Sequence, residues 1–102
     1  MHKRTRALDI PERVKRAVWE RDGHACIMCG SPDAKPNAHY IARSHSGLGV
    51  ERNIVTLCND CHNRYDQSAD RRYIREEIKA YLMSQYPDWD ETTLIYRRGY
   101  DR

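Results

Sequence analysis

The sequence lacks long hydrophobic runs, internal repeats and low-complexity segments. No apolar run reaches membrane-spanning length, and the N-terminal segment has no hydrophobic stretch of the signal-peptide type. These absences argue against a membrane or secreted protein, and we expect the chain to fold in the cytoplasm. With 39% hydrophobic and 32% charged residues, the composition is that of a globular domain and not of a disordered tail.

The chain is short and its net charge is small. At 102 residues, we expect one domain whose core is small enough to gain from an additional stabilising link. The net charge is +3, but basic residues gather near the N-terminus: Lys3, Arg4, Arg6, Arg13, Lys15, Arg16 and Arg21. This skew is compatible with a phosphate backbone as partner, and a solvated helix face is the alternative interpretation.

Local patterns divide the chain into an arm and one folded domain. Residues 1–8 show no periodicity and are predicted to be a flexible basic arm. Asp9 is a good N-cap and Pro11 suits a first helical turn, so a helix is predicted to follow. The domain is expected to span 9–102, with an N-terminal helix at 9–22, a core at 24–67 and a C-terminal helix and tail at 68–102.

Within the core, two strands and a helix are predicted. The strands lie at 37–42 and 54–57, and the loop between them contains two glycines. The helix begins at Asn59 or Asp60. A longer helix is predicted from Ser68 or Asp70 to Tyr86. For the tail from Asp88 onward, a helical turn at 90–94 and a strand at 94–96 both stay open.

Four cysteines form two Cys-x-x-Cys pairs, which favour a metal site over disulfides in a reducing compartment. Four thiolates make a closed tetrahedral zinc site that contributes folding free energy and leaves no open position for catalysis. A redox pair, the alternative, needs only one Cys-x-x-Cys. We therefore predict a structural Zn²⁺ bound by Cys26, Cys29, Cys58 and Cys61.

A histidine and a carboxylate lie one helical turn apart immediately after the last cysteine. His62 and Asp66 share one face of the predicted helix and can hold one divalent cation with open positions for water and a phosphate oxygen. His39, on the adjacent strand, can reach the other side of that ion and take a proton from an attacking water.

Together these residues resemble the HNH endonuclease family. The motif residues are Cys26-x-x-Cys29, His39-Tyr40-Ile41, Gly47, Gly49, Asn53 to Cys58 and Cys61-His62. The segment AHYIARSHSGLG is most similar to small HNH proteins of phages and prophages. The resemblance covers residues 25–66. It implies a small α+β, zinc-stabilised ββα-metal (His-Me finger, treble-clef-like) domain with flanking N- and C-terminal helices.

The resemblance also implies a role for each site residue. His39 is the general base, His62 a metal ligand and Asp66 the second ligand candidate. Asn53 fixes the hairpin loop or, as in some members, helps to bind the ion. The activity implied is hydrolysis of DNA phosphodiester bonds with one divalent ion such as Mg²⁺, Mn²⁺ or Ni²⁺. Many members have a metal ligand where this chain has Ala38, so metal affinity without DNA is expected to be weak.

Two other functions stay open. One is a catalytically inactive zinc-containing DNA-binding module, and the other is an assembly protein of a phage packaging complex. A phage packaging or recombination protein is a possible partner, and a phage-encoded chain would work in the host cytoplasm. Nicking or double-strand cleavage would depend on whether the protein is a monomer or a dimer. The candidate DNA-contacting residues, with solvated surface as the alternative, are Arg43, Arg64, Arg71 and Arg72.

Overall fold

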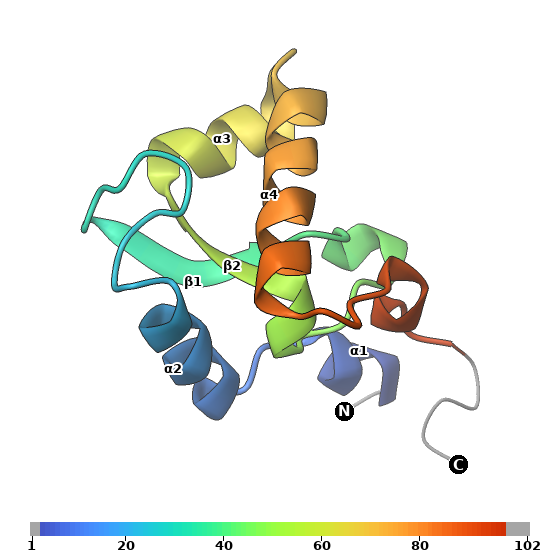
Figure 1. The fold of residues 1–102 in the computed structure, drawn as a ribbon. Coiled ribbons are helices and arrows are strands. Elements are labelled where there is room, and N and C mark those ends of the chain that lie inside the picture. Colours follow the sequence, from blue (N-terminus) through green and yellow to red (C-terminus); the bar gives the residue numbers. More distant parts are fainter. Residues whose placement is uncertain (1–2, 98–102) are drawn as a thin grey trace.

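A computed structural model describes residues 3–97 of the chain. Two antiparallel strands cross its centre, and helices lie on both sides of them (Figure 1). This is the α+β class predicted from the sequence. The main elements are α1 (Lys3–Leu8), α2 (Glu12–Arg21), β1 (Ala34–His39), β2 (Ile54–Cys58), α3 (Asn59–Gln67) and α4 (Arg71–Gln85). Three short 3-10 helices are η1 (Arg43–His45), η2 (Glu51–Asn53) and η3 (Glu91–Leu94).

Strand β2 is the centre of the core because both of its faces are covered. All five of its residues are buried. Ile54 packs with Val14 and Val18 of α2. Val55 and Leu57 belong to a larger cluster that includes the buried face of α4. Successive side chains of a strand point to opposite faces, so one short strand holds α2 and α4 on its two sides. Within residues 3–97, no helix is long and apolar enough to cross a membrane.

Helix α2 begins later than predicted. Its N-cap is Pro11, with φ of −63°, and no side chain caps the first turn. The residue before a proline is kept out of the helical region, so the helix cannot extend back through Ile10. The prediction that Asp9 caps this helix was therefore wrong. Asp9 instead forms a 2.6 Å ion pair with Arg43 in η1.

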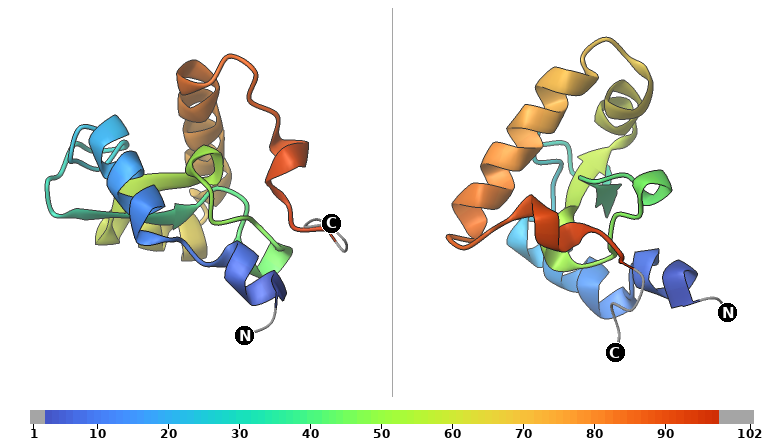
Figure 2. Two further views of the ribbon diagram at one scale, coloured as in Figure 1. Left: turned by 90° about the horizontal axis from the view of Figure 1, so that it is seen from below. Right: turned by 90° about the vertical axis from the view of Figure 1, so that its right-hand side faces the viewer.

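The flexible arm predicted for residues 1–8 was wrong for the part that the structure describes. Residues 3–8 form α1, which lies beside the segment that carries η1 (Figure 2). Leu8 is only 1% exposed, and the amide of Gly49 donates to the carbonyl of Ala7 over 3.0 Å. A helix this short depends on such tertiary contacts and is too short to show a periodic apolar pattern. Residues 1–2 lie outside the described range.

Strand β1 begins and ends earlier than the strand predicted at 37–42. It pairs Ala34 with Cys58 and His39 with Ile54. Pro36 is tolerated because a two-stranded sheet leaves β1 with a free edge. The register shifts between Lys35 and Ala38, shortly before His39. Such bulges occur next to active sites, where they re-aim a side chain.

The remaining elements agree with the sequence patterns. β2, α3 and α4 lie where they were predicted, and Asp70 is the N-cap of α4. In the tail the structure has the helical turn, η3, and not the strand, because Ile95 forms only an isolated β-bridge to Gly47. Residues 98–102 of the predicted tail lie outside the described range.

A buried polar network joins the end of α2 to β2 and α4. Arg21 donates to Asp22 over 2.7 Å and to the carbonyl of Ile54 over 2.7 Å. The Asp22 carboxylate also accepts from the backbone amide of Thr56 at 2.8 Å and from the Tyr81 hydroxyl at 2.6 Å. The side chain of Asp22 is fully buried, and that of Arg21 is 11% exposed. The two opposite charges therefore stabilise each other at a site where water does not solvate them.

We expect Asp22→Ala to destabilise the fold by about 3 kcal/mol, because it leaves the Arg21 charge and the Thr56 amide without their buried acceptor. Chemical denaturation of zinc-loaded protein measures this loss. Glu77→Ala, at an exposed position on α4, is the matched control and should change little. Equal stability of the two variants would contradict the importance of this network.

Candidate active site

The four cysteines come together at one end of the strands. Their sulfur atoms all lie within 4.8 Å of one another, and the sulfurs of Cys29 and Cys58 are 3.6 Å apart. Four sulfurs bound at about 2.3 Å to one zinc ion stand about 3.8 Å apart, so the cluster fits a tetrahedral site. None of the four forms a disulfide, and all but Cys29 are buried. The fold thus brings together the four cysteines that the sequence predicts as zinc ligands.

The backbone around the cysteines supports thiolate ligands. Gly30 has φ of +81°, which allows its amide to turn back and donate to the Cys26 carbonyl at 2.9 Å. The amide of Cys61 donates to the Cys58 sulfur at 3.4 Å. Burial disfavours the charged form of Cys26, but backbone hydrogen bonds outweigh it and lower the pKa of this thiol to about 7, whereas burial and the neighbouring thiols raise the pKa of Cys61. The thiolate is the form that binds metal.

Asn53 closes the loop between the two strands. Its side chain is fully buried, its Oδ1 accepts from the Ile41 amide at 2.8 Å, and its Nδ2 donates to the carbonyls of Ile41 (3.2 Å) and Leu48 (2.8 Å). Both the oxygen and the nitrogen of this side-chain amide are therefore hydrogen-bonded to backbone groups. This arrangement favours the loop-fixing role over the ion-binding role.

The two glycines of the loop allow close backbone contacts. A Cβ on Gly47 would overlap the carbonyl oxygen of Ile41, and one on Gly49 would overlap that of Asp9. Neither backbone can retreat easily, since Ile41 is held by Asn53 and Asp9 follows directly on α1. These contacts give the glycine spacing of the sequence motif a physical reason.

A hollow of about 190 Å³ lies between the end of β1 and helix α3. His39, His62 and Asp66 line it together, so the fold brings the three predicted catalytic and metal-binding residues to one place. The Nε2 atom of His62 lies 3.6 Å from Oδ2 of Asp66. Arg71, the first residue of α4, lines the same hollow. An imidazole, a carboxylate and a guanidinium group around one space can bind a cation and a phosphate side by side.

His39 is half-buried, and its Nε2 lies 3.0 Å from the carbonyl oxygen of Leu8. Burial lowers the pKa of His39 below its ordinary value of about 6.5, and the nearby charges of Arg43 and His62 act in the same direction. The Leu8 carbonyl and Asp9 oppose this shift without cancelling it. The imidazole is therefore neutral at neutral pH, as a general base must be.

Within residues 3–97, the four cysteines are the only group of three or more metal-ligating side chains that lie close together. The hollow at His39 therefore offers two ligand candidates, His62 and Asp66. Ala38 is fully buried and packs in the main core cluster. An ion held by two side chains needs water and a phosphate oxygen to complete its coordination.

The candidate DNA-contacting arginines differ in their surroundings. Arg71 lines the hollow at His39, as does Arg43, which is paired with Asp9. Arg64 lines a separate hollow beside the cysteines and forms a 3.1 Å ion pair with Asp70. The side chain of Arg72 is exposed. Arg43 and Arg71 are thus the two candidates that line the hollow at His39.

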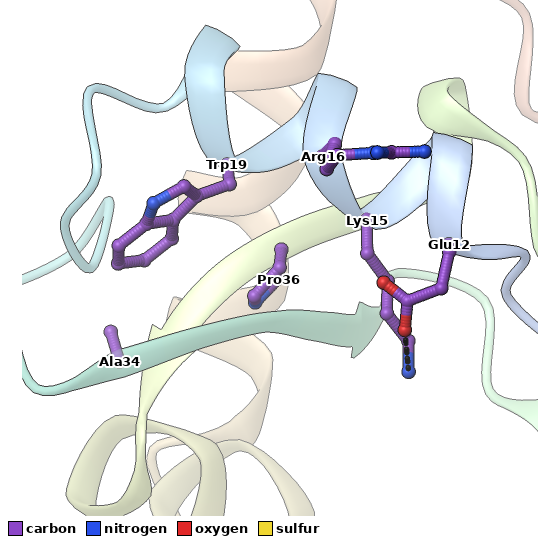
Figure 3. Close-up of a pocket in the computed structure, with 6 residues that line it drawn as sticks. All are labelled: Glu12, Lys15, Arg16, Trp19, Ala34 and Pro36. Carbon is purple, nitrogen blue, oxygen red and sulfur yellow. Dashed lines mark ion pairs between the residues drawn. The ribbon is translucent and has the colours of Figure 1, made fainter.

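A larger hollow of about 320 Å³ lies between α2 and β1 (Figure 3). Trp19 and Pro36 form its apolar part, and Lys15 and Arg16 lie along α2 at its border. None of the predicted catalytic or metal-binding residues lines it. Although it is larger than the hollow at His39, it is therefore not the candidate active site.

Two contributors to the hollow at His39 were not predicted from the sequence. Tyr65 lines it and donates to the carbonyl of Tyr40 at 2.6 Å. Its position three residues after His62, on the same helix face, could have indicated this. The Leu8 carbonyl could not have been found, because a backbone oxygen carries no side-chain signal.

Comparisons with known proteins agree with this geometry. The sequence model described as HNH endonuclease matches residues 26–68, which run from the first cysteine to the end of α3. Anaredoxin from Nostoc sp. (strain PCC 7120) is 30% identical over 54 residues, which are 52% of this chain and 71% of anaredoxin. No solved structure matches this chain.

We expect the purified protein to contain one zinc ion per chain, and Cys61→Ser to lose it. Structural zinc contributes about 10–16 kcal/mol in zinc-finger peptides. Even if zinc loss removed only about 3 kcal/mol from the free energy of unfolding, Tm would fall by roughly 12–24 °C. Elemental analysis and thermal unfolding with and without a chelator measure both effects. Iron in place of zinc, or a Tm that chelation leaves unchanged, would contradict a structural zinc site.

Proposed function

Because the chain belongs to the HNH endonuclease family, we propose that it is a metal-dependent endonuclease that hydrolyses DNA phosphodiester bonds. The observation that supports this most is the hollow that His39, His62, Asp66 and Arg71 line together. A zinc domain that only binds nucleic acid has no physical need for this set of side chains.

The residues of the hollow fit a divalent cation of the Mg²⁺, Mn²⁺ or Ni²⁺ type. His62 and Asp66, one helical turn apart, would hold it from one side. When bound, such an ion supplies positive charge to the scissile phosphate and to the leaving 3′ oxygen. The Tyr65 hydrogen bond to the strand end keeps α3 beside β1, which maintains the distance between ligands and base.

His39 accepts the proton of the attacking water in this proposal, and Arg71 contacts a phosphate oxygen. Neutral imidazole is the reactive form of the base, and the burial of His39 favours that form. A guanidinium group matches the geometry of a phosphate and keeps its charge at every working pH. Asn53 acts indirectly, by holding the loop that follows His39.

A DNA-binding zinc module without catalysis is the second candidate function. The specific observation in its favour is that Ala38 packs in the core and offers no ligand, which leaves two ligand candidates at the hollow. Such a module would still need its zinc and its basic surface. Cleavage assays in the presence of several divalent ions distinguish the two functions.

We expect His39→Ala to reduce metal-dependent nicking of supercoiled plasmid by about 100- to 10,000-fold, because general-base catalysis contributes that much. Zinc content and DNA affinity should stay close to those of the wild type. His24→Ala, an exposed histidine away from the hollow, is the matched control. Equal cleavage by wild type and His39→Ala would contradict the role of His39. No cleavage by zinc-loaded wild type with any ion would favour the binding module.

We expect cleavage to be lost only as the pH falls below about 6.5, through the lowered pKa of His39. Cleavage falls towards low pH because a general base is active only in its neutral form. A lowered pKa keeps the His39 imidazole neutral at a lower pH than usual. Other charged groups that face the hollow are Asp9, Arg43, His62, Asp66 and Arg71. Rates measured at saturating metal test this, with residual His39→Ala activity as control. A cleavage rate that stays unchanged as the pH falls to about 4.5 would count against His39 as the base.

A further inference from the structure

Helix α2 has a second stripe of side chains that does not pack in the core. Residues three and four apart share one face of a helix, and four residues of α2 with this spacing line the hollow of about 320 Å³. We call this hollow the α2–β1 groove. The neighbouring stripe, Val14 and Val18, packs on Ile54 of β2. In the part of the chain that the structure describes, the sheet has two strands, so no third strand covers the outer edge of β1. The groove is lined by Glu12, Lys15, Arg16 and Trp19 of α2 and by Ala34 and Pro36 of β1.

The α2–β1 groove leads along β1 towards the hollow at His39. Figure 3 shows Trp19 near Ala34, where β1 begins, and Lys15 near the other end of the strand. The strand ends at His39, which lines the second hollow. Pro36 precedes His39 by three residues, a distance of at most about 10 Å along a strand. One strand of B-DNA rises about 3.4 Å per nucleotide, so the two hollows are about three nucleotides apart.

The end of the groove at Trp19 suits a flat aromatic ring. The indole is half-buried and stacks on the imidazole of His24, with ring centroids 5.3 Å apart and planes 12° apart. Pro36 supplies the apolar surface opposite α2. Within residues 3–97, the Nε1–H of Trp19 has no hydrogen-bond partner and is not among the buried unpaired atoms, so it faces solvent. Such an indole can stack on a nucleobase and donate a hydrogen bond to it.

The rest of the groove suits phosphate groups. Arg16 is exposed and forms no ion pair with any residue that the structure describes. The Lys15 ammonium lies 3.9 Å from the Glu12 carboxylate, and their side chains are 41% and 79% exposed. An exposed pair of this kind contributes little, so Lys15 can bind another anion at small cost. Lys35, exposed on β1 beside the groove, adds a further positive charge. The groove is therefore complementary in charge to a phosphate backbone.

An unpaired strand fits these features better than a duplex or a peptide. In a duplex the base faces are stacked on one another, so stacking on Trp19 requires an unpaired base. A peptide strand would bind the outer edge of β1 through backbone hydrogen bonds. Pro36 has no N–H for such a ladder, and the strand is irregular between Lys35 and Ala38. A basic groove with an aromatic side chain is instead the combination that binds single-stranded nucleic acid.

We propose that the α2–β1 groove binds an unpaired DNA strand beside the cleavage site, with Trp19 stacked on a base and with Lys15 and Arg16 on phosphates. This rests on the proposed nuclease function and names the substrate class of that site. The scissile phosphate would lie at His39, about three nucleotides from the stacked base. DNA with an unpaired stretch next to the scissile bond is then cut faster than fully paired DNA.

The experiment compares the affinity of zinc-loaded full-length protein for a labelled single strand of about 12 nucleotides and for the matching duplex, without a catalytic ion. We expect the single strand to bind more tightly. Trp19→Leu keeps an apolar side chain but removes the stacking ring, so it should weaken binding of the single strand about 10-fold and leave its salt dependence unchanged. Trp19→Phe, which retains a ring, should recover most of this loss.

The two basic residues are tested by the salt dependence. Each phosphate contact on a single strand contributes about 0.7 to the slope of log K against log salt, so Lys15→Ala/Arg16→Ala should lower this slope by about 1.4. A purely structural role would change stability and not the slope. Arg13→Ala, an exposed position on α2 outside the groove, is the matched control. Zinc content and Tm of every variant show whether it is folded.

Two results would overturn the proposal. One is a wild type that binds the duplex at least as tightly as the single strand. The other is a folded Lys15→Ala/Arg16→Ala protein with the affinity and salt slope of the wild type, which would favour a peptide on the edge of β1. This second test is decisive even where Trp19→Leu does not fold. A wild type that binds the single strand through the groove but cleaves no DNA would support the groove and contradict the nuclease function.

Discussion

The structure depends on the linkage between the two Cys-x-x-Cys pairs. Cys58 is the last residue of β2 and the N-cap of α3, and Cys61 lies in the first turn of that helix. A metal ion bound by this pair and by Cys26 and Cys29 would therefore fix the direction of α3 relative to the strands. His62 follows immediately, so the same constraint aims it at the hollow. A two-stranded sheet with so small a core could not set this geometry alone.

The loop after β1 is fixed by a different kind of interaction. Asn53 is fully buried, and its amide replaces backbone partners that the loop cannot find within a strand or helix. With the loop held, Gly49 and Arg43 offer a fixed surface on which α1 docks. The order of dependence thus runs from Asn53 to the loop, from the loop to α1, and from α1 to the ring of His39.

Local chemical signals were enough to predict part of this fold. Cysteine spacing, the apolar run of β2 and the periodicity of α4 each predicted an element that the structure contains. Asp9 was assigned wrongly because Pro11 keeps the helix from extending back to it, and its carboxylate pairs instead with Arg43, which is distant in sequence. Helix α1 was missed because its stability comes from docking and not from its own residues. The Leu8 carbonyl has no signature in any sequence, so that part of the site needed coordinates.

Ala38 has a consequence for how an ion would bind in the proposed mechanism. The side chain fills the core beside Val55, so strand packing occupies a position where related proteins place a ligand. An ion on His62 and Asp66 would then take further ligands from water and from the scissile phosphate. Since DNA would complete the coordination, ion and DNA must each raise the affinity for the other by the same factor. A weakly held ion in the free protein is therefore compatible with a well-ordered one in the complex with DNA.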